Sequence, residues 1–224
     1  MSKKMMLLAT ALTALAFAAL PTVASAGEPQ THCTNLAASC SFTVHSGASS
    51  WRTASAGSFN CSATTGSGTM GTTTGSVSFV FTGCTESVFK SACTTSGKSS
   101  GTIETTALTY HNIYVSDAKT SPGVLMTPNA TSGIFAHFTC AGGLVTKTIH
   151  GKGLIGTLTS PKCGGDSNVY EFDFEESVPG TQKHMHITGT GETYDLTDQS
   201  GNTGSLVASG KITITSTSAS LTCV

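Results

Sequence analysis

Hydrophobic residues alternate with polar ones in short segments from residue 41 onward, and Gly, Pro, Asn and Asp interrupt these segments. In residues 76–82, for example, Val77, Phe79 and Phe81 fall on one face and hydroxyl residues fall on the other. A period of two is typical of β-strands with one buried face. Outside the first 26 residues no window keeps an apolar period of 3.6, so we expect very little helix.

This pattern predicts an all-β fold of about ten to thirteen short antiparallel strands, which must close as two packed sheets or as a barrel. We expect a single β-sandwich, because several connections carry loops of their own, and a β-barrel is the alternative. Residues 41–224 form the predicted all-β domain. Residues 27–40 lack periodicity and are expected to be an N-terminal arm held by Cys33 and Cys40.

The first 26 residues have the organisation of a signal peptide. Lys3 and Lys4 precede an apolar run, and small residues at 24–26 match a signal-peptidase site. The run is shorter than the roughly 20 residues that span a bilayer, and no later run reaches that length. We therefore expect a secreted or cell-envelope protein, of bacterial type, that begins near Gly27 and has no membrane span after cleavage.

An exported chain meets oxidising conditions, so an even number of cysteines predicts disulfides. Eight cysteines allow 105 connectivities. Irregular spacing without a Cys-x-x-Cys pair favours disulfides over zinc. Ranked by chain geometry, the expected pairs are Cys84 with Cys93, Cys33 with Cys40, Cys140 with Cys163, and Cys61 with Cys223.

The amino-acid composition of the chain limits the kinds of partner that it can bind. Without Lys3 and Lys4, nine basic residues face twelve acidic ones, a formal charge of −3. This balance argues against nucleic acid or an anionic membrane, since both require a basic patch. Charged residues make up 10% of the chain, against about 25% in ordinary globular proteins, and Ser, Thr and Gly replace them. A hydroxyl-covered surface could meet envelope glycans or proteins.

The runs Phe81-Thr82-Gly83-Cys84-Thr85, Ala92-Cys93-Thr94-Thr95-Ser96-Gly97 and Gly101-Thr102-Ile103-Glu104-Thr105 resemble a segment of secreted, Cys-containing, β-rich proteins of unknown function from high-GC bacteria. The resemblance covers roughly 25 residues. It implies export, an all-β fold and a bridge between Cys84 and Cys93. It implies no activity and carries over no site residue.

One predicted hairpin could carry chemistry. If Pro179 and Gly180 form its tip, Glu175 faces His184 and Asp173 faces His186. Two carboxylates opposite two imidazoles could bind a divalent metal such as zinc, or act as an acid and base pair. The alternative is a solvated face on which opposite charges pair across the strands.

A second polar segment, residues 195–202, contains Asp195 and Asp198 and could offer oxygen ligands to calcium, or be a polar hairpin loop. We expect no resident cofactor. The favoured function is a non-enzymatic binding or surface-structural protein. The alternatives are a carrier that encloses an apolar small molecule in a cavity of a few hundred Å³, and an extracellular metal-dependent or hydrolytic enzyme centred on His184 and His186.

Overall fold

In the computed structural model, the longest described strand, β20 (Thr203–Ile214), joins two rings of antiparallel strands. The structure describes residues 28–33, 39–54, 57–116, 118–160, 165–187, 190–216 and 219–223. The expected signal peptide and Cys163 lie outside these residues.

The upper ring closes through residues 208–214 of β20. These residues pair with β2 along one edge and with β16 along the other. The remaining strands complete the circle by antiparallel pairing in the order β2, β5, β6, β10, β11, β14, β16. Their bounds are β2 (Cys40–Ser46), β5 (Ala63–Met70), β6 (Thr74–Thr82), β10 (Leu108–Tyr114), β11 (Pro122–Pro128), β14 (Leu154–Ser160) and β16 (Val169–Phe174).

The lower ring closes through the first half of β20, which pairs with β3 and β19. From β3 the pairing runs through β4 and β7, crosses to β8 by a bridge between Thr85 and Ala92, and returns through β12, β13 and β19. Their bounds are β3 (Ser49–Thr53), β4 (Gly57–Cys61), β7 (Thr85–Glu86), β8 (Cys93–Thr94), β12 (Ile134–Cys140), β13 (Val145–Gly151) and β19 (Leu196–Asp198), and β9 (Ile103–Glu104) pairs with β6.

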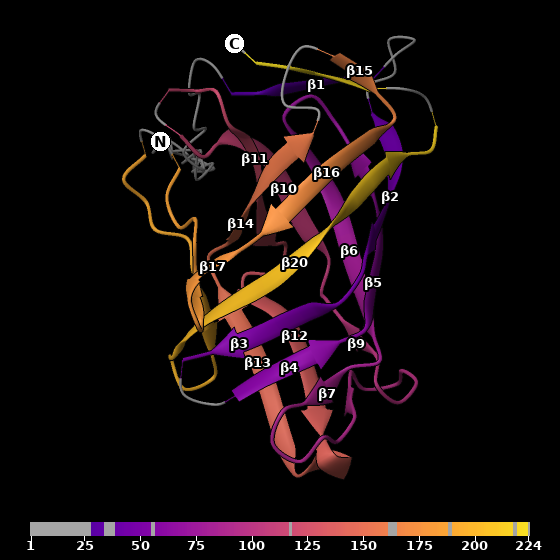
Figure 1. The fold of residues 1–224 in the computed structure, drawn as a ribbon, viewed down its shortest axis with the longest axis vertical. Helices are drawn as coiled ribbons and strands as arrows, with labels where there is room; N and C mark the ends of the chain where they lie inside the picture. Colours follow the sequence, from indigo (N-terminus) through magenta and orange to yellow (C-terminus); the bar gives the residue numbers. More distant parts are fainter. Residues whose placement is uncertain are drawn as a thin grey trace, which may run out of the picture.

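The two rings stack as one elongated barrel (Figure 1). Within this barrel β2 leads into β3, β4 into β5 and β6 into β7 after one or two residues, so a long strand is counted as two. These interruptions, together with several strands of only two or three residues, explain why the described residues contain 21 strands, more than the sequence predicted. The all-β prediction is confirmed, and the fold closes as the barrel alternative rather than as the expected sandwich.

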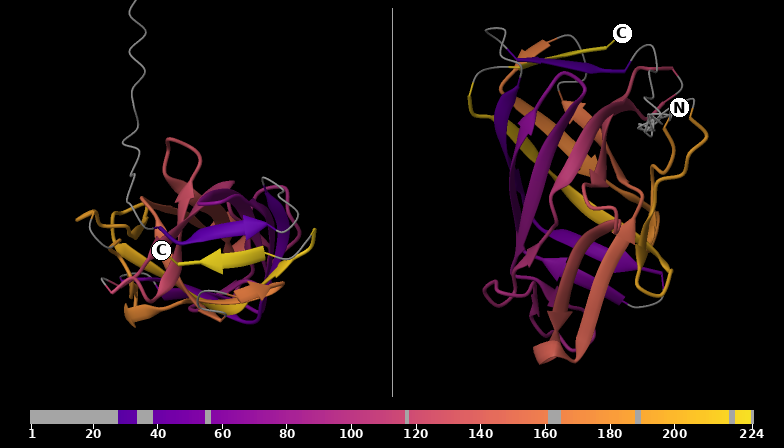
Figure 2. Two further views of the ribbon diagram at one scale, coloured as in Figure 1. Left: turned by 90° about the horizontal axis from the view of Figure 1, so that it is seen from above. Right: turned by 180° about the vertical axis from the view of Figure 1, so that it is seen from behind.

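A three-stranded cap sheet covers the upper end of the barrel (Figure 2). It contains β1 (Gln30–Cys33), β21 (Ala219–Thr222) and β15 (Gly165–Ser167). The Tyr170 hydroxyl donates to the Ala219 carbonyl at 2.7 Å, and the Asn112 amide donates to the Thr31 hydroxyl at 2.9 Å. Part of the expected N-terminal arm is therefore a paired strand that closes the barrel.

Aromatic side chains fill the barrel because every second residue of its strands faces inward. The predicted inward rows are confirmed: Val77, Phe79, Phe81, Tyr170, Phe172 and Phe174 are all buried. The single tryptophan, Trp51, is 2% exposed, and its ring meets that of Phe81 edge to face at 5.3 Å. Glycines on β5 and β6 leave the space that the rings occupy, since a Cβ on Gly68 would lie 2.6 Å from the Phe42 ring.

Two neighbouring disulfides brace the lower part of the barrel, and their connectivity corrects the prediction. Cys61 pairs with Cys84, and Cys93 pairs with Cys140 across β8 and β12. The backbone N–H of Cys93 donates to the Cys84 carbonyl, so Cys84, just before β7, lies next to Cys93 of β8, while each forms its disulfide with a different strand, β4 or β12. Proximity in sequence suggested the wrong partner.

The structure also tests the three other expected disulfides. The Cys33–Cys40 disulfide is confirmed. The pairs Cys140 with Cys163 and Cys61 with Cys223 are excluded, because Cys140 and Cys61 are bonded elsewhere; Cys223 is also disulfide-bonded. The bridge between Cys84 and Cys93 that the family resemblance implied is likewise wrong.

Two smaller features complete the described fold. A short hairpin, β17 (Glu176–Val178) with β18 (Thr181–Gln182), lies against the side of the barrel, and one 3-10 turn, η2 (Ala141–Gly143), connects β12 to β13. Across the ranges that the structure describes, no helix has the length and apolar character needed to cross a bilayer.

The close packing at Gly68 gives a direct stability prediction. In Gly68→Ala the new methyl group would meet the Ser76 carbonyl oxygen at 2.0 Å as well as the Phe42 ring. We expect the free energy of unfolding, measured with urea, to fall by about 1–3 kcal/mol. Gly47→Ala is the matched control, since nothing lies within 4 Å of its added Cβ. Equal stability of the two variants would contradict the packing described here.

Candidate functional site

In the hairpin that the sequence suggested as a metal or acid-base site, the residues pair differently from the prediction. Asp173 lies in β16, where Thr157 of β14 and Ser209 of β20 occupy the positions on either side. It therefore does not face His186, which forms an isolated bridge with Thr193. The expected pair of Asp173 and His186 does not form.

The expected pair of Glu175 and His184 is displaced by one residue. A bulge between Glu176 and Val178 shifts the pairing of β17 with β18. As a result the backbone N–H of Lys183 donates to the Glu175 carbonyl at 2.9 Å, and the Lys183 ammonium lies 2.7 Å from the Glu175 carboxylate. Glu175 thus pairs with a lysine instead of an imidazole.

Electrostatic effects on these residues arise from burial and neighbouring charges. Burial raises the pKa of Asp173, and the carboxylates of Glu175 and Glu171 raise it further. Burial and the Lys183 charge lower the pKa of His184, against the opposing effect of Glu175. Among the residues that the structure describes, no group of three or more His, Cys, Asp or Glu side chains is placed to hold a metal ion.

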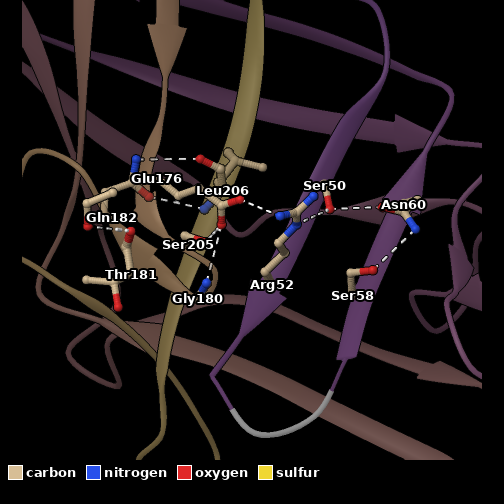
Figure 3. A network of polar contacts seen from close by, with 11 residues as sticks. Ser50, Arg52, Ser58, Asn60, Glu176, Gly180, Thr181, Gln182, Ser205 and Leu206 are labelled. Carbon is tan, nitrogen blue, oxygen red and sulfur yellow. Dashed lines mark hydrogen bonds and ion pairs between the residues drawn. The ribbon is translucent and has the colours of Figure 1, made fainter.

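The most extensive polar network near this hairpin centres on Glu176 (Figure 3). Its carboxylate accepts from the Arg52 guanidinium at 2.5 Å, the Ser205 hydroxyl at 3.0 Å and the Gly180 N–H at 3.3 Å. Gln182, which is buried, bonds both backbone groups of Leu206. These contacts fix the hairpin to β3 and β20, and they leave Glu176 occupied as a structural anchor.

The second polar segment is a structural turn. Asp198 is 3% exposed, and its carboxylate accepts from the backbone N–H groups of Ser200 and Asn202 and from the Asn202 amide. Burial alone would raise the pKa of Asp198, but these hydrogen bonds and the Lys147 charge together lower it. The carboxylate stabilises the turn between β19 and β20.

The barrel interior is packed. Two cavities, of about 30 and 20 Å³, adjoin along Phe79, Met126 and Phe172. A water molecule requires roughly 10–15 Å³ measured this way, whereas ligand pockets are several hundred Å³. The cavities therefore have room for water and lack the space for an enclosed small molecule.

A different feature stands out at the lower end of the barrel. Among the described residues, five large hydrophobic side chains are exposed, and the three most exposed are Val88 (68%), Phe89 (71%) and Leu144 (88%). They belong to two segments, residues 87–91 between β7 and β8 and residues 141–144 around η2, which we call the end loops. Both segments are therefore turns that present apolar side chains to solvent.

The two end loops leave the barrel side by side. Cys93 and Cys140 are opposite each other in the antiparallel pair of β8 and β12. The first loop enters β8 just before Cys93, and the second leaves β12 just after Cys140. Both therefore emerge at the same end of this pair, next to the Cys93–Cys140 disulfide, at the lower end in Figure 1.

A buried carboxylate sets the shape of the first end loop. Glu86 is 6% exposed, and one of its oxygens accepts from the Val88 N–H at 2.9 Å while the other accepts from the Phe89 N–H. The Glu86 N–H donates to the Ser91 carbonyl at 3.0 Å and closes the loop. The two backbone bonds to the carboxylate turn both apolar side chains outward.

Strained backbone occurs in each end loop. Lys90 and Ala141 have φ angles of 56° and 52°, a left-handed conformation that costs a non-glycine residue energy. Such strain persists only where surrounding contacts hold it, and it is concentrated at functional sites. The end loops are thus specifically shaped and are the candidate site of this protein.

Comparisons with protein-family models, with curated proteins and with solved structures find no significant match. The site is consequently assigned from geometry alone.

Sequence reasoning missed the end loops, although one signal was present. Val88 and Phe89 are adjacent apolar residues within a segment that Cys84 and Cys93 delimit, where the period of two is absent. Leu144 directly follows the glycine pair Gly142-Gly143 and precedes β13 by one residue. Apolar residues at turn positions were the available indication.

Glu86 provides a test of how the first end loop is held. Glu86→Ala leaves the N–H groups of Val88 and Phe89 without their acceptor, so we expect their amide hydrogen exchange to accelerate at least tenfold. The free energy of unfolding should fall by about 1–3 kcal/mol. Glu171→Ala is the control, because the Glu171 side chain is 47% exposed and its nearest ion pair is 3.5 Å long. Unchanged exchange in Glu86→Ala would refute the carboxylate clamp.

The hydrogen bonds to the Asp198 carboxylate predict that the folded protein loses stability when this group is protonated. Its pKa in the folded state is lowered from 3.8, so its stabilising contribution is complete above the unfolded value and disappears as pH falls through the folded value. Asp198→Asn should lose about 1–3 kcal/mol of stability at pH 7. Between pH 5 and pH 2 its stability should decline less than that of the wild type. Parallel decline of both proteins, measured by urea unfolding, would rule out this role.

Proposed function

We propose that this protein is a non-enzymatic binding protein of an oxidising, extracytoplasmic compartment, and that it attaches to its partner through the end loops. The observation that carries the proposal is the concentration of Val88, Phe89 and Leu144 at one end of the barrel. Exposed apolar side chains that gather in one place mark interaction sites more often than scattered ones do.

The covalent structure supports the proposed compartment. Three described disulfides, between Cys33 and Cys40, Cys61 and Cys84, and Cys93 and Cys140, are of a kind that persists outside the reducing cytoplasm. The signal peptide expected at residues 1–26 would deliver the chain there. We accordingly place the protein in the cell envelope or outside the cell.

The construction of the site supports binding by preorganised loops. The clamp of Glu86 and the adjacent Cys93–Cys140 disulfide hold the backbone in place before any partner arrives. Preorganisation reduces the entropy that binding must overcome. Removing each apolar side chain from water contributes roughly 1.5–3 kcal/mol, which suits reversible attachment.

A paired set of variants tests the proposal. Binding is measured to the envelope fraction of the cells that produce the protein, by sedimentation, for Phe89→Ser with Leu144→Ser and for Val169→Ser with Val178→Ser. The control pair removes the two exposed apolar residues that lie away from the end loops. We expect the end-loop pair to weaken binding at least tenfold, since each side chain contributes about 1.5–3 kcal/mol when buried.

The control pair should bind as the wild type does, within twofold. Both pairs change exposed residues, so their thermal unfolding should match that of the wild type. The proposal is wrong if the end-loop pair binds the envelope as tightly as the control pair.

A further inference from the structure

The shape of the end loops restricts what they can contact. Each of the three apolar side chains is more than two-thirds exposed and stands on a turn, so each protrudes into solvent. A protein partner would need a matching pocket for each tip. The boundary between headgroups and acyl chains of a bilayer accepts protruding apolar side chains without any preformed pocket.

The small area of the three exposed side chains also favours a membrane over a protein as the partner. A stable protein interface buries roughly 800 Å² on each partner. Even an aromatic side chain contributes only about 150–250 Å², so three partly exposed side chains fall short of that area. At a membrane interface no minimum area is required: apolar side chains insert about 5–10 Å, attachment strength scales with the apolar area that they bury, and a small area gives weak, reversible attachment.

The exposed charge at this end is positive. Lys90 is exposed beside Phe89, and Lys147 is partly exposed in β13. Glu86 and Asp198 are 6% and 3% exposed, and their carboxylates accept backbone N–H groups. Glu104, which Thr95 links to β12, has a side chain that is 30% exposed and forms an ion pair with Lys98. The chain carries a net negative charge overall, but the charge that a partner at the end loops would meet comes from lysine.

We infer that the end loops dock on a lipid membrane surface, with Val88, Phe89 and Leu144 entering the interface and Lys90 facing the phosphate headgroups. This inference rests on the proposed function and names the partner of the same site. The expectation from net charge, which argued against anionic membranes, averaged the charge over the whole chain. Next to the first end loop Glu86 is buried while Lys90 is exposed, so the local surface differs from that average.

Vesicles of purified lipid test the inference. Phe89→Trp places a fluorescent side chain at the end loops, while the single native tryptophan, Trp51, is buried and should not respond. We expect the emission of Phe89→Trp to shift to shorter wavelength with phosphatidylcholine vesicles. Binding should be about fivefold tighter when phosphatidylglycerol is included, because a lysine near an anionic surface contributes about that factor. Lys90→Gln should remove this preference.

The outcomes separate the two proposals. If wild type and Phe89→Trp bind neither type of vesicle, yet the end loops are still required for binding to the envelope fraction, the lipid inference is overturned and the partner is a protein or glycan. Binding to vesicles that survives Phe89→Ser with Leu144→Ser also overturns it. Val178→Ser serves as the matched control, and its vesicle binding should equal that of the wild type.

Discussion

The double pairing of β20 is the constraint on which the rest of the structure depends. One strand of twelve residues has β2 and β16 on its two edges in the upper ring, and β3 and β19 in the lower ring. Among the described residues, each strand of the upper ring is paired with a neighbour on both sides, which is how antiparallel sheets avoid pairing with other chains. The proposed contact with a partner lies at one end of the barrel.

The two ends of the barrel differ in how they are covered. At the upper end the cap sheet covers the interior, and the Cys33–Cys40 disulfide ties it to β2. At the lower end the Cys61–Cys84 and Cys93–Cys140 disulfides brace the strands from which apolar loops extend into solvent. One end is thus sealed, whereas the other presents shaped, strained loops. In this packed barrel with little internal space, the proposed binding site is therefore on the outside, at the lower end.

The sequence predicted the inward rows well, because a period of two depends only on local geometry. Phe79 and Phe172 are buried where the alternation placed them. It predicted the local Cys33–Cys40 disulfide, but it could not choose between barrel and sandwich or predict the other disulfides, since these depend on which strands become neighbours. Cys84 is close to Cys93 in sequence, but long strands bring it opposite Cys61. A single bulge next to Glu176 was enough to separate Glu175 from His184. The end loops were missed because the sequence alone does not show that their apolar side chains are exposed.

Amide hydrogen exchange of the wild-type protein, free and bound to its envelope fraction, tests the central claim most directly. The account predicts that binding slows exchange in residues 86–91 and 141–147 and leaves the cap sheet and the barrel wall unchanged, because the partner covers only the end loops. Slowed exchange confined to the cap sheet or to the wall strands would place the contact elsewhere and contradict the account.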